Sequence, residues 1–322
     1  MLSTADRFRW HAEVEFRGVS EIYFEWASCI AQDDEILALI EGLPDHKQRA
    51  PLLFAAARFA GAPVGSYARL RPWLVESWDV VEAIARSRSQ QTNEAGRCAT
   101  LLPALAEIHG PLALLEVGAA GGACLFPDRY AYEYTTVHGA STGLGPSGGS
   151  HVLLRCEIDP TTAIPKRIPD VVWRAGIDLN PLSFANRDYV AWLETLVWPE
   201  PTERRERLEA VAKIIRADPP GIAKGDAIDL LPALAAEAPS DATLVVFNSA
   251  VLAYFTLPDR VRFADTVRAL DATWLSNEGP GVLLWVTAQV DPSIEIGQQF
   301  ILARDNRPIA LTGGHGQTYH QL

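Results

Sequence analysis

Apolar residues recur three and four positions apart throughout residues 1–108. The stretches "DDEILALIEGL" and "RAPLLFAAARFAG" show this spacing clearly, and Pro and Gly separate one stretch from the next. A period between three and four places the apolar side chains on one face of an α-helix. The pattern therefore predicts an all-helical N-terminal region over residues 1–108, made of several short helices.

The pattern changes after residue 110 to short runs typical of β-strands, which alternate with helical stretches. Such alternation indicates βαβ units that build a parallel sheet with helices on both faces. We therefore expect an α/β domain over residues 109–322. Its predicted strands cover residues 112–117, 152–157, 170–177, 242–248 and 281–287.

One low-complexity segment, "HGASTGLGPSGGS" at residues 138–150, interrupts this domain. The flanking stretches "RYAYEY" and "HVLLRCEI" both resemble strands. We expect a β-hairpin of about residues 130–157 inserted into the sheet domain, with the glycine-rich segment as its mobile tip. A lid over a binding site is the alternative interpretation of the same segment.

Charge and composition narrow the possible partners. The chain has 322 residues and a formal net charge of -12, which argues against a nucleic-acid partner because phosphate binding needs clustered Lys and Arg. The four Cys residues form no CxxC pair, and the seven His residues show no metal-ligand spacing. We expect no metal centre and no disulfide framework, and we expect a small molecule as the substrate.

The beginning of the sequence, "MLSTADRFRWHAEVEF", lacks the apolar run of a secretory signal. The longest apolar run, "ATLVVFNSAVLAYFTL", is shorter and more polar than a membrane helix of about 20 residues requires. These observations predict a cytoplasmic protein with no membrane partner. The sequence leaves the oligomeric state open.

The stretch "LLEVGAAGGAC" predicts a buried strand that ends in a glycine-rich turn followed by a helix. Ligands gather at such turns because backbone N–H groups and a helix N-terminus point there. The turn lacks both the G-x-G-x-x-G of dinucleotide folds and the lysine of a P-loop. It does resemble the first motif of Rossmann-like S-adenosylmethionine methyltransferases, at positions Glu116, Gly118, Ala120 and Gly122.

Two later stretches resemble further motifs of those enzymes. "VVWRAGIDLNPL" resembles their second strand, and the resemblance implies that Asp178 accepts hydrogen bonds from the two ribose hydroxyls. "IAKGDAIDLLPAL" resembles the end of the third strand, which implies that Asp226 and Ala227 contact the adenine. The inserted hairpin accounts for the long separation between Glu116 and Asp178. Glu157 is the alternative ribose acceptor.

The remaining strands of the resemblance follow in order. "ATLVVFNSAVLAYF" resembles the fourth strand, whose end carries catalytic or substrate-contacting residues, and Asn248 and Ser249 occupy that place. "GVLLWVTAQV" resembles the fifth strand, and "FILARDN" with "GQTYHQL" resembles a closing hairpin. The resemblance implies a class I methyltransferase sheet with S-adenosylmethionine as the cofactor.

Several long stretches, among them "SQQTNEAGRCATLLPAL", "LVWPEPTERRERL" and "WLSNEGPGV", together resemble the bacterial domain-of-unknown-function 2332 (DUF2332) family. The resemblance spans nearly the whole chain. It implies a methyltransferase-like sheet behind a helical N-terminal region, and it implies no particular substrate. Related sequences tend to have a histidine before Ser249, where this chain has Asn248, and this difference argues against a general base at that position.

Other polar residues are candidates for ligand contacts. Asn93 and Arg97 lie four apart in "QTNEAGR" and would share one face of a helix. A guanidinium matches a carboxylate, so Arg97 is expected to bind the methionyl carboxylate of the cofactor. The alternative is an internal salt bridge from Arg97 to Glu94 or Glu116.

In "WLSNEGPG", Asn277 and Glu278 are expected to hold the substrate at a strand–loop junction. The alternative interpretation of this stretch is a turn stabilised by Asn and Gly. The expected function is methyl transfer from S-adenosylmethionine to a small molecule. The alternatives are a catalytically inactive sensor of adenosine ligands on the same fold, and an adenosine-nucleotide enzyme of another kind.

Overall fold

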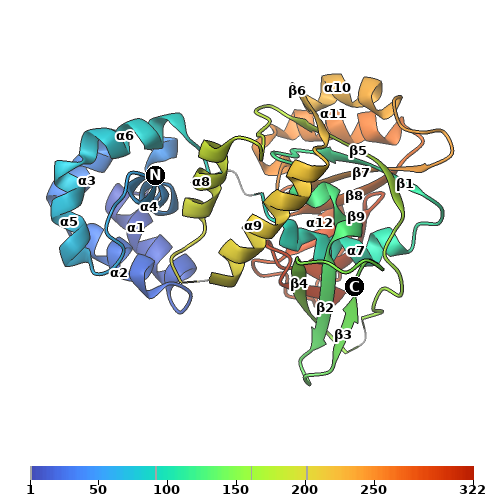
Figure 1. Cartoon of the computed structure of the whole chain (residues 1–322), viewed down its shortest axis with the longest axis horizontal. Coiled ribbons are helices and arrows are strands. Elements are labelled where there is room, and N and C mark those ends of the chain that lie inside the picture. The colour runs from blue at the N-terminus through green and yellow to red at the C-terminus, as the bar shows by residue number, and fades with distance from the viewer. Residues whose placement is uncertain (1, 91–92, 161, 201) are drawn as a thin grey trace. The chain divides into compact units, whose positions relative to one another are not determined.

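The computed structural model describes residues 2–90, 93–160, 162–200 and 202–322. The chain divides into two compact units, whose elements are labelled in Figure 1. The helical unit comprises Met1–Thr92 and Ala185–Leu208, and the sheet unit comprises Asn93–Phe184 and Glu209–Leu322. Part of the helical unit therefore comes from the middle of the sequence.

The predicted helical N-terminal region is confirmed. Ser20 and Asp33 begin two of its helices by accepting a hydrogen bond from the backbone N–H three residues on. The rings of Phe16, Tyr23 and Phe54 meet in its core. The elements are α1 (Thr4–Trp10), η1 (His11–Phe16), α2 (Glu21–Ile30), α3 (Asp34–Glu41), η2 (Asp45–Lys47), α4 (Ala50–Phe59), α5 (Tyr67–Glu76), α6 (Trp78–Ser87) and α8 (Arg187–Leu196); α9 (Thr202–Ala217) begins in this unit.

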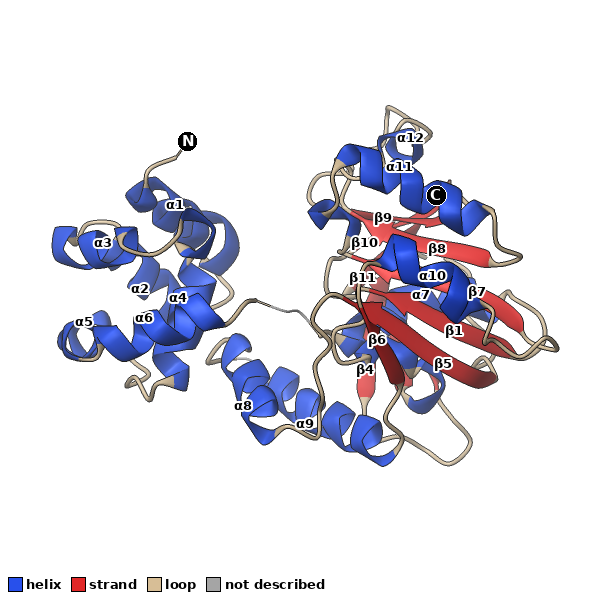
Figure 2. Cartoon of the chain, turned by 90° about the horizontal axis from the view of Figure 1, so that it is seen from above, coloured by secondary structure: helices blue, strands red, loops and turns tan. Residues whose placement is uncertain are grey.

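In the described part of the sheet unit the strands form one 11-stranded sheet (Figure 2). The sheet order is β3-β2-β4-β11-β10-β9-β8-β7-β1-β5-β6. The strands are β1 (Leu112–Val117), β2 (Ala131–Thr136), β3 (Ser141–Leu144), β4 (Leu153–Ile158), β5 (Val171–Asp178), β6 (Gly221–Lys224), β7 (Thr243–Ser249), β8 (Thr273–Glu278), β9 (Phe300–Arg304), β10 (Arg307–Thr312) and β11 (Thr318–Gln321).

The neighbours β6, β5, β1, β7 and β8 all run parallel, and most strand pairs of the sheet are parallel. The chain then turns back, so that β9, β10 and β11 each pair antiparallel with the strand before it. The mixed α/β architecture predicted from the sequence is confirmed. All five carboxyl ends of the parallel strands meet at one edge of the sheet, where ligands of open α/β sheets bind.

Helices and short helical turns cover the sheet. The helices α10 (Ala227–Ala235), α11 (Leu257–Arg268) and α12 (Leu284–Thr287) form one core with Leu115 and Val117 of β1. Because side chains alternate along a strand, Glu116 points to the opposite face. There lie α7 (Cys98–Ala106), η3 (Ala95–Arg97), η4 (Ala123–Leu125) and η5 (Pro127–Arg129), while η6 (Leu252–Tyr254) follows β7.

The prediction of a strand at residues 281–287 is wrong. The stretch contains the short helix α12, and the fifth parallel strand is β8, "TWLSNE". A short apolar run fits a buried strand and a buried helix equally well, so its periodicity could not separate the two. The sequence of β8 did not predict a strand because it contains the polar residues Ser276, Asn277 and Glu278. The structure buries all three.

The predicted hairpin of residues 130–157 also needs correction. Its two flanks, β2 and β4, are parallel neighbours and do not form a hairpin with each other. The antiparallel partner of β2 is β3, which lies within the glycine-rich segment that we expected to be a mobile tip. The interpretation of the whole segment as a lid finds no support in this pairing.

Candidate functional site

The candidate site lies at the carboxyl ends of the parallel strands. Glu116 is in register with Gly176 of β5 on one side and with Phe247 of β7 on the other. Ser249, at the end of β7, is in register with Asn277 of β8. The sheet thus brings together predicted site residues that are more than 100 positions apart in the sequence.

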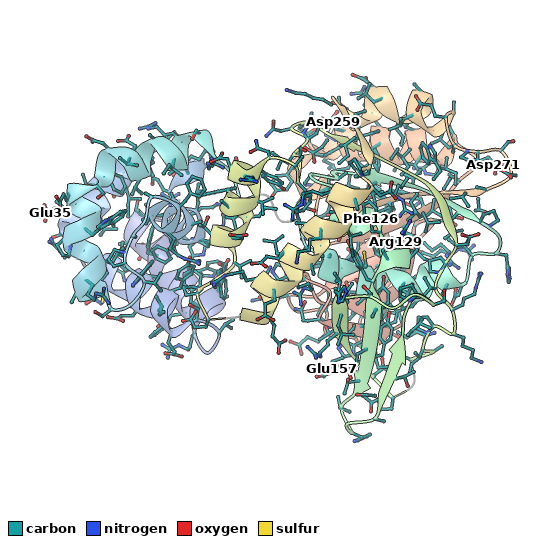
Figure 3. The ribbon with its side chains drawn as sticks, viewed as in Figure 1. Glu35, Phe126, Arg129, Glu157, Asp259 and Asp271 are labelled. Atoms are coloured by element: carbon teal, nitrogen blue, oxygen red, sulfur yellow. The ribbon has the colours of Figure 1, made fainter. Side chains whose placement is uncertain are left out.

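Asp178 contacts the glycine turn directly. Its carboxylate accepts a hydrogen bond from the backbone N–H of Ala120 at 2.8 Å and another from Asn180 at 2.7 Å. The alternative acceptor, Glu157 (labelled in Figure 3), lies on β4 between β2 and β11. Of the two acids, Asp178 is therefore the one beside the turn. Asp226 is exposed and begins α10, where it accepts the N–H of Ile228 at 2.8 Å.

The glycine turn is packed against protein atoms. A Cβ at Gly118 would overlap the side chain of Val251, and one at Gly122 would lie 2.7 Å from Cγ of Pro220. The turn donates most of its backbone N–H groups to acceptors within the sheet unit, namely those of Gly118, Ala119, Ala120, Gly122 and Ala123. Such a turn cannot serve as a phosphate cradle.

The helix expected after the turn is absent. The turn leads into η4, a single turn of 3-10 helix, and then through η5 into β2. The prediction that a helix dipole helps to bind a ligand at this turn is therefore wrong, because one turn of 3-10 helix aligns too few peptide dipoles.

Arg97 and Asn93 are held by backbone groups. Arg97 donates from Nε to the carbonyl oxygen of Gly314 at 3.0 Å and from Nη1 to that of Ser249 at 2.9 Å. Within the described residues it forms no ion pair, so the alternative salt bridge is wrong. Asn93 precedes η3 and accepts the N–H of Ala123 at 3.1 Å, so the two residues do not share a face of an α-helix.

Asn248 and Asn277 belong to a buried network that joins β7, β8 and β10. Asn248 is fully buried, donates to Glu278 Oε1 at 2.7 Å and accepts from Trp274 Nε1 at 2.9 Å. Asn277 donates to the hydroxyl of Ser249 at 3.3 Å and accepts from that of Thr312 at 2.7 Å. Both amides are occupied, which argues against the predicted catalytic role of Asn248 and the predicted substrate contact of Asn277.

Glu278 fixes the loop that follows β7. Besides the bond from Asn248, its Oε1 accepts the backbone N–H groups of Val251 at 2.9 Å and Leu252 at 3.0 Å. Burial raises the pKa of this carboxyl, and these hydrogen bonds oppose the shift. Glu278 thereby holds Val251 against Gly118, a structural role in place of the predicted substrate contact.

Glu116 is a buried carboxyl with an unsatisfied oxygen. It is 6% exposed, and its Oε2 is buried with no hydrogen-bond partner among the described residues. Burial, followed by the nearby Cys124 thiol, raises the pKa of Glu116 well above its usual value, while the charge of Arg97 opposes the shift. The folded protein therefore favours the protonated form of Glu116.

This pKa shift predicts a pH-dependent effect of Glu116→Gln on stability. Above the ordinary pKa of a glutamate the unfolded chain loses its proton while the folded chain retains it, so the wild type loses stability as pH rises toward the folded pKa. Glutamine does not titrate. We expect the free energy of unfolding of Glu116→Gln, relative to the wild type, to rise as the pH increases above about 5 in urea denaturation series. Glu237→Gln, which alters an exposed carboxyl of the same unit, should show no such rise, and equal curves for the two variants would contradict the assignment.

Comparison with known proteins identifies the family. The model of the DUF2332 family, described as an uncharacterized protein conserved in bacteria, matches residues 59–320. The chain belongs to this family. No curated protein and no solved structure matches the chain. The match includes the whole candidate site, so that site belongs to the family region of the chain.

Two further findings concern metal ligands and membrane-spanning helices in this DUF2332 protein. In the described parts of the chain, no three or more His, Cys, Asp or Glu residues are grouped so that they could hold a metal ion. No helix there is both long and apolar enough to span a membrane.

Two residues at the site were not predicted from the sequence. Leu179 directly follows Asp178 and is 71% exposed. Val251 covers Gly118. An apolar residue after the strand-ending acid is a signal that could have identified Leu179, whereas nothing in the sequence distinguishes Val251 from a core residue.

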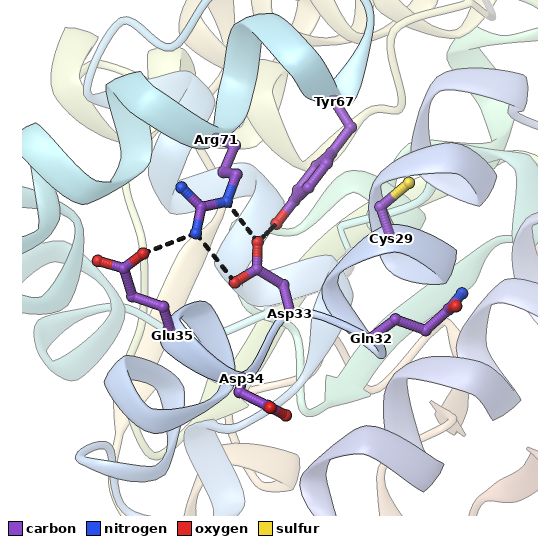
Figure 4. Close-up of a pocket in the computed structure, with 7 residues that line it drawn as sticks. All are labelled: Cys29, Gln32, Asp33, Asp34, Glu35, Tyr67 and Arg71. Carbon is purple, nitrogen blue, oxygen red and sulfur yellow. Dashed lines mark hydrogen bonds and ion pairs between the residues drawn. The ribbon is translucent and has the colours of Figure 1, made fainter.

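The helical unit has a separate cavity of about 500 Å³, shown in Figure 4. Asp33 accepts hydrogen bonds there from the Tyr67 hydroxyl at 2.8 Å and from Nε of Arg71 at 2.6 Å, and Arg71 also pairs with Glu35. Burial alone would raise the pKa of Asp33, but the bonds from Arg71 and Tyr67 outweigh it and lower the pKa. Because Asp33 also caps α3, this network stabilises the helical unit and is not our candidate site.

Proposed function

We propose that this DUF2332 protein is an S-adenosylmethionine-dependent methyltransferase that acts on a small-molecule acceptor. The observation that carries the proposal is the hydrogen bond from the backbone N–H of Ala120 that holds the Asp178 carboxylate against the glycine turn of β1, while the N–H of Asn180 binds the other carboxylate oxygen. A carboxylate fixed beside such a turn is placed to accept the two hydroxyls of a ribose. Each oxygen already accepts one backbone N–H, and a carboxylate has about four acceptor sites, so two remain.

The strand order supports a ligand at this position. After β1 the chain first forms β2, β3 and β4 at the far end of the sheet. It then adds β5 and β6 on one side of β1 and returns to β7 and β8 on the other. The order therefore reverses between β1 and β7, and open α/β sheets bind ligands in the crevice outside the strand ends at such a point. Asp178 and Asp226, at the ends of β5 and β6, lie along this edge.

The chemistry of the turn favours an adenosine without phosphates. Because most of its N–H groups are already bonded within the sheet unit, it offers little to an anion. This argues against the alternative of an adenosine-nucleotide enzyme. The exposed Leu179 offers an apolar surface to a base, and Asp226, which is also exposed, could accept the adenine amino group.

Methyl transfer requires little from the protein beyond alignment. The sulfonium already activates the methyl group, so catalysis consists mainly of holding the acceptor in line with water excluded. The burial of Asn248 is therefore compatible with transfer. The same burial also favours the second candidate, a catalytically inactive adenosine sensor, which would bind the ligand without turnover. Transfer of a labelled methyl group to any component of a metabolite extract would exclude the sensor.

Calorimetric titration with S-adenosylhomocysteine tests the binding proposal. We expect saturable heat with the wild type and at least about a tenfold weaker affinity for Asp178→Ala, because hydrogen bonds to a charged acceptor contribute about 1.5–3 kcal/mol each. Asp178→Asn, which keeps one oxygen, should give an intermediate affinity and guards against a folding defect of the alanine variant. Asp229→Ala, which removes an exposed acid from the first turn of α10, should bind as the wild type does. The absence of saturable heat with the wild type, or equal affinities of the Asp178 variants and the wild type, would refute the proposal.

A further inference from the structure

Two cysteines meet beside the glycine turn. Cys98 is the first residue of α7, and Cys124 lies in η4, directly after the turn. The Cys98 thiol donates a hydrogen bond to the backbone carbonyl oxygen of Cys124 at 3.6 Å. The Cys124 thiol also points to the carbonyl oxygen of Glu94 at 3.4 Å.

The surroundings shift the pKa values of these two thiols in opposite directions. The neighbouring Cys98 side chain, together with the charge of Arg97, lowers the pKa of Cys124, although burial and Glu94 oppose the shift. Burial raises the pKa of Cys98 well above its usual value. Cys124 is 6% exposed and Cys98 is fully buried, so the thiol with the lowered pKa is also the less buried of the two.

We infer that Cys98 and Cys124 form a reversible redox pair that closes to a disulfide on reaction with hydrogen peroxide. The Cys124 thiolate attacks one peroxide oxygen, the O–O bond breaks, and with one proton the products are a sulfenic acid and water. The sulfur of Cys98 then attacks the Cys124 sulfur, its proton leaves with the hydroxyl group as a second water, and the S–S bond forms. Two thiols are oxidised and one peroxide is reduced to two waters.

The bond would connect two segments that build the candidate site. Arg97 precedes Cys98, and Ala123, whose N–H is bound by Asn93, precedes Cys124. Closing the pair therefore ties the segment after the glycine turn to the start of α7. The inference depends only on the two thiols and their surroundings, so it stands or falls independently of methyl transfer.

The test uses the full chain, reduced and then treated with hydrogen peroxide before denaturation and alkylation. Mass spectrometry should show a loss of two hydrogens and a peptide pair linked between Cys98 and Cys124, both reversed by dithiothreitol. Cys98→Ser should stop at a dimedone-reactive sulfenic acid on Cys124, and Cys124→Ser should leave Cys98 reduced. Cys29→Ser, which removes a cysteine of the helical unit, should form the same link as the wild type.

Three outcomes would overturn the inference. Both thiols could remain alkylatable after peroxide, the linked peptides could involve Cys29 or Cys156, or Cys98→Ser could yield no sulfenic acid. The first two outcomes are read from the linked peptides of the wild type, so they do not depend on how any variant folds.

Discussion

Gly316→Ala is expected to lower the free energy of unfolding of the sheet unit by about 3 kcal/mol or more. Gly316 has a φ of +85°, and a Cβ there would overlap the carbonyl oxygen of Gly96 and lie 2.7 Å from the backbone nitrogen of Arg97. Backbone atoms cannot rotate away as a side chain can. The loop would have to move, and it carries Gly314, whose carbonyl accepts the Nε of Arg97.

Gly139→Ala is the matched control for this change. Gly139 has nearly the same φ, +83°, but no atom lies within 4 Å of its added Cβ. The free energy of unfolding of this variant should fall only by about 1–2 kcal/mol, which is the cost of placing an alanine in the left-handed conformation. Hydrogen exchange with mass spectrometry along a urea series would measure each unit separately. Equal losses at the two glycines would show that the contact with Gly96 does not constrain the fold.

Glu278→Ala is expected to lower the free energy of unfolding of the sheet unit by about 3 kcal/mol, because it leaves buried donors without an acceptor. Those donors are the backbone N–H groups of Val251 and Leu252 and the amide of Asn248. In the Glu278→Ala variant, the amide hydrogens of the loop after β7 should exchange faster than those of β7 itself. Hydrogen exchange of the folded variant would detect this difference.

Glu278→Gln separates the hydrogen bonds from the charge. Glutamine keeps an oxygen at Oε1 and carries no charge, and burial already favours the protonated form of Glu278 by raising its pKa. We expect the glutamine variant to lose much less stability than the alanine variant at neutral pH. A glutamine variant as unstable as the alanine variant would mean that the charge, and not the acceptor, holds the loop.

The sequence identified strands by local pattern but could not identify their partners. β1, β5 and β7 are apolar runs bounded by turns, and their predicted positions are confirmed. β2 and β4 were recognised as strands but paired wrongly, because β-propensity describes a residue's fit to a sheet and not which strand lies beside it. β8 was missed because a network of buried hydrogen bonds lets polar side chains occupy core positions.

In the candidate site, too, the sequence predicted positions but not all interaction partners. The position of Asp178 beside the turn followed from the order of motifs along the chain. The partners of Arg97 did not, because they are the backbone carbonyls of Gly314 and Ser249. Every residue supplies such a carbonyl, so no sequence pattern marks the ones that a buried guanidinium will find.

A crystal structure of the protein grown with S-adenosylhomocysteine tests the central claim most directly. The account predicts density for an adenosine at the carboxyl edge of the sheet, with the ribose hydroxyls within hydrogen-bonding distance of Asp178 and the base against Leu179. Density for the ligand elsewhere, or none at this edge when the ligand is saturating, would contradict it.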